Sequence, residues 1–195
     1  DHVNDAVVVF DDVVATQAEF RKRWLLHSID APVLGTDRFE LFIPATGRPG
    51  RSGGRLHGHV LLPRQPLLHS IGGPGFEFFV DGRNYDEEGR AQAAIARLGH
   101  GRAEPGAWRL ELIPAREARA DQFLVVMLPT PTAAAPAARV TRLEDGERVG
   151  AEIVGAQRTT RWWFTPGRLG VRVEVEEGAA RRGHALNDGY RPGRC

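Results

Sequence analysis

The sequence predicts an all-β protein, an antiparallel β-sandwich of about a dozen short strands with one short helix. Short apolar runs rich in Val, Ile, Leu, Phe and Trp recur along the whole chain. Between them lie 23 glycines and 13 prolines, which favour turns over continued regular structure. The only helical periodicity lies in residues 87–98, where the apolar positions are Ala91, Ala94, Ile95 and Leu98.

The composition excludes several functional classes. The formal net charge is +1 and the charges are interspersed, so no net field attracts the chain to nucleic acid or to an anionic membrane. No apolar run is long enough to span a bilayer. Cys195 is the only cysteine, so an intrachain disulfide is impossible and the compartment stays open. Lys22 is the only lysine among 26 basic residues, a bias that suggests GC-rich coding.

The first residues, 1–5, lack the basic and then apolar pattern of a signal peptide. A strand is expected almost at once, at residues 6–10. We therefore expect the chain to start inside a larger protein.

The first third of the chain contains four expected strands. Residues 6–10 form a β-branched run that is typical of a strand buried on both faces. Residues 23–27 follow, and residues 38–43 alternate apolar and polar side chains as a half-buried strand does. A loop rich in Gly, Arg and Pro, residues 46–54, leads into the fourth strand at residues 55–62.

A tight corner stands at the centre of the pattern. Strands are expected at residues 67–71 and 76–80, on either side of Gly72-Gly73-Pro74-Gly75. Glycine permits backbone angles closed to other residues and proline fixes its own φ, so this segment predicts a sharp turn. Asp81-Gly82 predicts a second turn directly afterwards.

The remaining expected strands are residues 107–113, 122–128, 139–143, 149–154, 159–164 and 170–176. Asp145-Gly146 is a hairpin signal between two of them. We divide the chain into a sandwich core, a Pro/Ala-rich connection, the remaining strands of the same sandwich and an Arg/Gly-rich disordered tail. These are residues 1–128, 129–137, 138–177 and 178–195.

Histidines supply the sharpest candidate for metal binding. His57 and His59 are two apart on an expected strand, so their side chains point the same way and can reach one metal ion. His69 supplies a third ligand if the next strand faces the same side. The competing interpretation is a set of ordinary surface histidines, since no glutamate follows before Glu77.

Three further residues are candidates for substrate binding. Arg83 and Tyr85 follow the Asp-Gly turn and are expected on a loop, where they bind a ligand or merely cap the turn. Trp162 and Trp163 point to opposite faces of one strand. One of them is expected in the core, while the other, Trp163, is a candidate sugar-stacking platform or interface contact.

No motif completes a catalytic set. The sequence contains no G-x-S-x-G elbow, no H-E-x-x-H pair and no P-loop. His27, at the end of an apolar strand, is more often a hydrogen-bonded structural residue than a base. From the residues alone, the chain is a β-sandwich without a recognisable reaction centre.

Short motifs follow one another in a consistent order along most of the chain. From the N-terminus they are Val9-Phe10-Asp11-Asp12-Val13-Val14, Phe20-Arg21-Lys22-Arg23-Trp24-Leu25-Leu26-His27-Ser28, Ala31-Pro32, Gly54-Arg55-Leu56, Leu61-Leu62-Pro63, Ile71-Gly72-Gly73-Pro74-Gly75, Phe78-Phe79-Val80-Asp81-Gly82, Asn84-Tyr85, Glu104-Pro105-Gly106-Ala107-Trp108-Arg109-Leu110-Glu111 and Asp121-Gln122-Phe123-Leu124. In this order they resemble the C-terminal β-sandwich part of heparinase II/III-like polysaccharide lyases. The resemblance covers residues 7–128, with a weaker continuation to residue 175.

The resemblance implies a bacterial enzyme, periplasmic or secreted, in which an N-terminal helical toroid precedes the sandwich. Such enzymes cleave acidic, uronate-containing polysaccharides by β-elimination, with Tyr and His as usual acid and base. In the family these residues lie mostly in the toroid and at the start of the sandwich. The Asn-x-His-x-Asp-x-Gly-type segment with its metal ligands is missing here. No catalytic residue is therefore carried over to this chain, and no cofactor is expected.

The sequence thus predicts the sandwich part of a polysaccharide lyase, which packs against the toroid, forms one wall of the substrate cleft and is inactive alone. Two alternatives stay open. A non-catalytic carbohydrate-binding module would use the tryptophans and the Arg-rich loops. A small metal-dependent β-barrel enzyme would use His57, His59 and His69.

Overall fold

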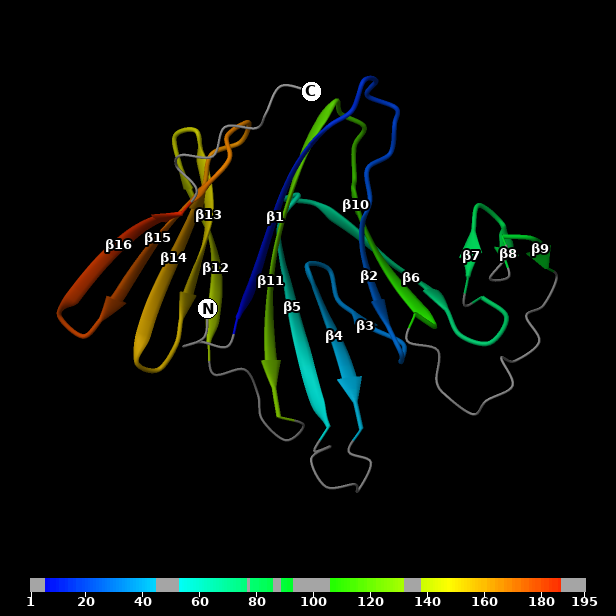
Figure 1. Ribbon diagram of the computed structural model, residues 1–195, viewed down its shortest axis with the longest axis horizontal. Coiled ribbons are helices and arrows are strands. Elements are labelled where there is room, and N and C mark those ends of the chain that lie inside the picture. Colours follow the sequence, from blue (N-terminus) through cyan, green and yellow to red (C-terminus); the bar gives the residue numbers. More distant parts are fainter. Residues whose placement is uncertain are drawn as a thin grey trace.

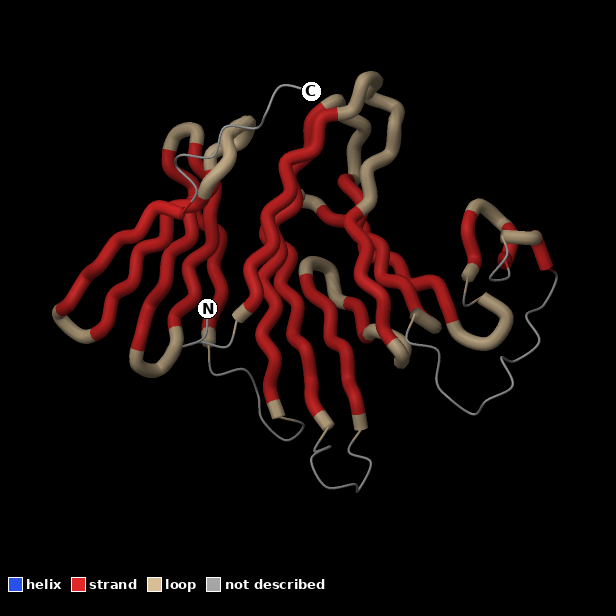
Figure 2. The backbone as a smooth tube through the Cα atoms, viewed as in Figure 1, coloured by secondary structure: helices blue, strands red, loops and turns tan. Residues whose placement is uncertain are grey.

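The computed structural model describes residues 6–44, 53–76, 78–85, 89–92, 106–131 and 138–186. Every regular element in these residues is a β-strand, and all strand pairs are antiparallel (Figures 1 and 2). The predicted fold class is confirmed, since the strands form open sheets that do not close into a barrel. Among the described residues no helix is long and apolar enough to cross a membrane.

Within the described residues the strands form four sheets. The central sheet has the order β1 (Val7–Val14), β11 (Ala120–Thr130), β5 (Gly54–Leu62), β4 (Arg38–Ile43) and β3 (Val33–Leu34). The short sheet consists of β2 (Trp24–Ser28), β10 (Trp108–Pro114) and β6 (Pro66–Gly72). The C-terminal sheet consists of β12 (Arg139–Asp145), β13 (Arg148–Val154), β14 (Arg158–Phe164), β15 (Val171–Glu177) and β16 (Ala180–Leu186). The flap sheet consists of β7 (Phe79–Val80), β8 (Arg83–Tyr85) and β9 (Ala91–Gln92).

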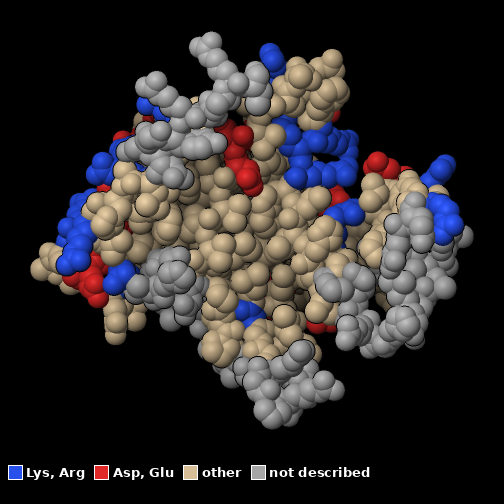
Figure 3. Space-filling view, in the orientation of Figure 1, with Lys and Arg blue, Asp and Glu red and all other residues tan. Residues whose placement is uncertain are grey.

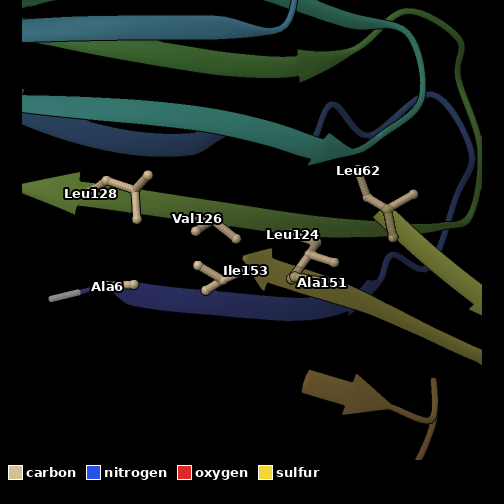
Figure 4. Packing of buried hydrophobic residues seen from close by; sticks show 7 residues of the cluster. All are labelled: Ala6, Leu62, Leu124, Val126, Leu128, Ala151 and Ile153. Carbon is tan, nitrogen blue, oxygen red and sulfur yellow. The ribbon is translucent and has the colours of Figure 1, made fainter. Parts of the chain in front are cut away.

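The central sheet is covered on both faces, by the short sheet on one side and by the C-terminal sheet on the other (Figure 1). Alternate residues of β11 enter two hydrophobic clusters. The cluster toward the C-terminal sheet consists of Ala6, Leu62, Leu124, Val126, Leu128, Ala151 and Ile153 (Figure 4). The cluster toward the short sheet consists of Phe39, Val60, Leu110, Leu112, Phe123, Val125 and Met127.

This layering explains the continuous apolar run that predicted a buried strand at residues 122–128. All residues from Phe123 to Leu128 are buried, because each successive side chain enters the opposite layer. The strands after residue 138 form a separate third layer. Phe10 of β1 stacks on Phe164 of β14, with the ring centroids 4.5 Å apart, and so adds to the packing of this layer on the central sheet.

Two expectations are corrected. Ala91 and Gln92, within the expected helix of residues 87–98, form β9 and pair with β8; residues 87–88 and 93–98 lie outside the described residues. Residues 180–186, within the expected disordered tail of 178–195, form β16, which pairs along its length with β15. This edge strand has no buried face, so its composition gave no strand signal. Residues 187–195 lie outside the described residues.

The corner after β6 is built as expected. Gly73 has a φ of 81°, and a Cβ there would lie 2.8 Å from the Trp108 ring, so only glycine fits. Asn84, which is 4% exposed, holds the following segment. Its side-chain oxygen accepts a hydrogen bond from the Phe78 amide at 2.9 Å, and its amide donates to the Gly75 carbonyl at 2.8 Å.

Candidate functional site

The outer face of the short sheet carries a buried charge network. Leu110 and Leu112 face the core, so Arg109 and Glu111 point outward from the middle strand β10. The Glu111 side chain is only 6% exposed and lies 2.8 Å from Arg109 and 3.7 Å from Arg23. A buried carboxylate requires such partners, because the removal of an unpaired ion from water costs on the order of several kcal/mol.

The same network fastens the flap sheet. The Arg109 guanidinium donates a hydrogen bond to the Phe79 carbonyl at 2.9 Å, which joins β7 to β10. His27 is paired with Arg109 across the ladder, and His69 is paired with Glu111. Both histidines are exposed, so they flank the buried charges on the outer face.

A pocket lies at the end of the short sheet where β10 leads into β11. We call it the loop pocket, because the β1–β2 loop supplies Phe20, Arg21 and Lys22 and the β10–β11 loop supplies Arg116 and Glu117. Its volume is about 250 Å³, and His69 of β6 also lines it. Figure 3 shows a group of Lys and Arg side chains around a hollow on this side of the molecule, near β2 and β10.

Lys22 fixes the two loops of the pocket to each other. Its side chain is 7% exposed and pairs with Asp121 at 3.0 Å. Its ammonium also donates to the carbonyls of Ala118 and, at 3.3 Å, of Phe20. The compact ammonium has three donors, one for each of these three acceptors. This gives a physical reason for the only lysine in an arginine-rich chain.

A second polar cluster lies on the central sheet. The His57 ring contacts Glu40 through Nδ1 at 3.2 Å and Thr130 through Nε2 at 3.2 Å, and Arg55 binds the same Glu40 at 2.7 Å. Burial lowers the pKa of His59, and the nearby Arg38 lowers it further. The contacts with Glu40 and Thr130 occupy both ring nitrogens of His57.

The predicted metal trio does not come together. Gly58 packs on Phe39 and Val60 belongs to the cluster under the short sheet, so His57 and His59 point to the opposite face of the central sheet. His69 is on the outer face of the short sheet, two layers away. No group of three His, Cys, Asp or Glu residues in the described part of the chain is placed to hold a metal ion. Because the sheets are open, the structure also contradicts the alternative of a small β-barrel enzyme.

The other candidate residues are spread over the molecule. Arg83 and Tyr85 do not lie on a loop as expected, because β8, which pairs with β7 and β9 in the flap sheet, includes both. Trp163 lies on the C-terminal sheet at the other end of the molecule (Figure 1). Trp162 packs against the core, which confirms that the two tryptophans face opposite ways. The Arg148 guanidinium covers the Trp163 ring at 5.0 Å, and the ring edge lies close to Gly150. A sugar that stacked on Trp163 would therefore have to displace Arg148 or approach beside it.

The sequence did not single out the loop pocket. Its residues come from three segments far apart in the chain, and each is an ordinary loop or strand residue by itself. The one usable signal was the isolated Lys22 in a chain that otherwise uses arginine. A scan against models of protein families finds no match to this chain, and a search of curated proteins finds none either.

Proposed function

We propose that this chain is the glycan-facing β-sandwich part of a polysaccharide lyase of the heparinase II/III-like class. In this proposal the lyase cleaves uronate-containing glycans by β-elimination, and the sandwich forms one wall of its substrate cleft. A helical toroid domain supplies the remaining walls and the reactive groups.

One observation carries the proposal. The motifs behind the resemblance interact with one another on the short sheet and the flap sheet. Arg23 contacts Glu111, Glu111 contacts Arg109, and Arg109 binds the Phe79 carbonyl. These residues belong to three different motifs, 20–28, 104–111 and 78–82. These contacts bring three of the motifs together on one face of the molecule, which supports the proposal.

The network assigns a supporting role to the outer face of the short sheet. Arg109 and Glu111 neutralise each other and hold two sheets together, so neither is available to bind substrate. The cations that can receive a uronate carboxylate are Arg21 and Arg116 at the loop pocket, both of which are exposed. Proton abstraction next to that carboxylate is left to the toroid domain in this proposal.

A turnover assay tests the absence of a reaction centre. The purified chain is incubated with alginate and with hyaluronan, and the unsaturated product of β-elimination is followed by its ultraviolet absorbance. We expect no increase above a protein-free control. Product formation that depends on the chain concentration would place the catalytic groups within this polypeptide and contradict the proposal.

Affinity electrophoresis separates a cleft wall from a stand-alone carbohydrate-binding module. A wall contributes only some of the contacts to a glycan, so it is slowed slightly in a gel that contains alginate and not at all in a dextran gel. A module that binds by itself is arrested at low polymer concentration. Arrest would favour the module, and identical mobility in both gels would contradict a glycan-facing wall.

A further inference from the structure

The loop pocket has the size of a site for one ring. Its volume of about 250 Å³ lies below the range of roughly 300–1,000 Å³ that is usual for drug-sized ligands. Its lining includes the exposed Arg21 and Arg116 together with the partly buried strand residue Ile113. A single monosaccharide unit therefore suits it better than a chain of them.

The charges at the pocket favour an anion that also carries hydroxyl groups. Lys22 and Asp121 neutralise each other at 3.0 Å. Neither Arg21 nor Arg116 has a hydrogen bond or ion pair among the described residues, so both guanidinium groups can receive a carboxylate bidentately. The exposed Glu117, which is equally unpaired there, can accept hydrogen bonds from hydroxyl groups.

The pocket also offers apolar contact. Phe20 is 52% exposed and Leu67 is 46% exposed, although both are large hydrophobic residues. An aromatic ring beside charged groups suits a ligand with one apolar face and polar edges, as a pyranose ring has. Neutral apolar ligands would leave the two arginines unused, and small inorganic anions would leave Phe20 and Leu67 unused.

The site is held in shape before any ligand arrives. Lys22 joins the β1–β2 loop, through the Phe20 carbonyl, to the β10–β11 loop through the Ala118 carbonyl and to the start of β11 through Asp121. Arg21 and Arg116 stand on these two loops. A preformed arrangement reduces the entropy that is lost on binding, so a small ligand can be retained by few contacts.

We infer that the loop pocket binds one sugar acid residue, with its carboxylate between Arg21 and Arg116 and its ring against Phe20. The identity of the ligand as a sugar acid rests on the proposed function, whereas the preference for an anion rests on the pocket alone. The pocket is then the subsite at which the chain distinguishes a uronate from a neutral sugar.

Because Lys22 is the only lysine, its NMR signal can report ligand binding at the loop pocket. The whole chain labelled with ¹³C-lysine has the Cε–Hε correlations of one lysine only, and these report from inside the pocket wall. Methyl glucuronide and methyl glucoside are titrated separately, since they share the ring and differ in the carboxylate. We expect a saturable shift with the glucuronide and binding on the order of tenfold or more weaker with the glucoside.

Variants assign the effect to the two arginines. Arg21→Ala and Arg116→Ala should each weaken glucuronide binding by on the order of tenfold. Arg21→Gln removes the charge with a milder change in shape and replaces the alanine variant if that one unfolds. Arg172→Ala is the matched control, because Arg172 is an exposed arginine on the outer face of the C-terminal sheet, and it should leave the affinity unchanged.

The inference is wrong if the glucuronide shift does not saturate, if the glucoside binds equally well, or if both arginine variants bind as the parent chain does. This result is separate from the turnover and electrophoresis assays. A chain that prefers glucuronide at Arg21 and Arg116 but cleaves alginate would disprove the wall role and keep the subsite. A chain that binds no glucuronide but is slowed in alginate gels would keep the wall and remove the subsite.

Discussion

The histidine cluster of the central sheet and the loop pocket contain similar kinds of polar side chains. They differ in whether those side chains are bound to partners within the protein. In the cluster, His57 contacts both Glu40 and Thr130, and Arg55 binds Glu40. In the pocket, the largely covered Lys22 and Asp121 are paired, while Arg21 and Arg116 face solvent without a partner in the described residues. Residue type drew attention to the cluster, but the unpaired groups that can bind a ligand are in the pocket.

The largest effect should come from the pair that shapes the pocket. Lys22→Met removes the ammonium and leaves the Asp121 carboxylate, whose side chain is 13% exposed, without its partner. Breaking a buried pair in this way should lower the free energy of unfolding by about 3 kcal/mol. Urea denaturation measures the loss. A change below about 0.5 kcal/mol, as for an ordinary surface site, would mean that the two loops do not depend on Lys22.

The next effect tests the packing behind the histidine cluster. A Cβ at Gly58 would lie 2.1 Å from the Phe39 ring, on the face of the central sheet opposite the histidine cluster. Gly58→Ala should therefore cost about 2 kcal/mol by forcing Phe39 out of place, again measured by urea denaturation. Gly183→Ala on β16 is the control, because its nearest atom is 4.0 Å away. Equal stability of the two variants would contradict the tight contact.

A smaller effect should follow when the cluster loses its central charge. Glu40→Gln keeps the shape of the side chain but removes the charge shared by Arg55 and His57. We expect a loss of about 1 kcal/mol in the free energy of unfolding, because the site is only partly exposed. Asp37→Asn, at the exposed Arg38 pair, should change stability by less than about 0.5 kcal/mol. A more stable Glu40→Gln variant would show that the cluster is strained.

The smallest effect is a pH dependence from His59. Burial and Arg38 lower its pKa below the ordinary value of 6.5. The unfolded chain then binds the proton more readily than the folded chain, so this contribution to stability is complete above pH 6.5 and is lost as the pH falls through the folded pKa. Thermal denaturation from pH 7.5 to 5 should show this fall, and His59→Gln should reduce it. An unchanged slope in the variant would assign the dependence to other groups.

The sequence predicted local elements well where side chains alternate or stay apolar. Residues 38–43 and 122–128 gave clear patterns, and β4 and β11 lie there. The sequence could not show how the sheets are layered, because an apolar run buried on both faces does not indicate which strands cover each face. It missed β16 because that strand is stabilised by backbone pairing with β15, and not by an apolar face.

The candidate site was harder to predict for a related reason. Histidine spacing suggested a shared metal ion. In the structure, His57 and His59 lie on the face of β5 that points away from the short sheet, so they are far from His69. The loop pocket depends on contacts such as that of Lys22 with Ala118, which are 96 residues apart. Such distant contacts leave no periodic trace in the sequence.

The strand β11 belongs to two hydrophobic clusters at once, and this has a consequence for how the protein comes apart. If either outer sheet detached, half of the β11 side chains would meet water, so the remaining layer would lose its support as well. Melting should then occur in one cooperative step for all three layers, and the β11 amides should be the slowest in the chain to exchange with deuterated solvent.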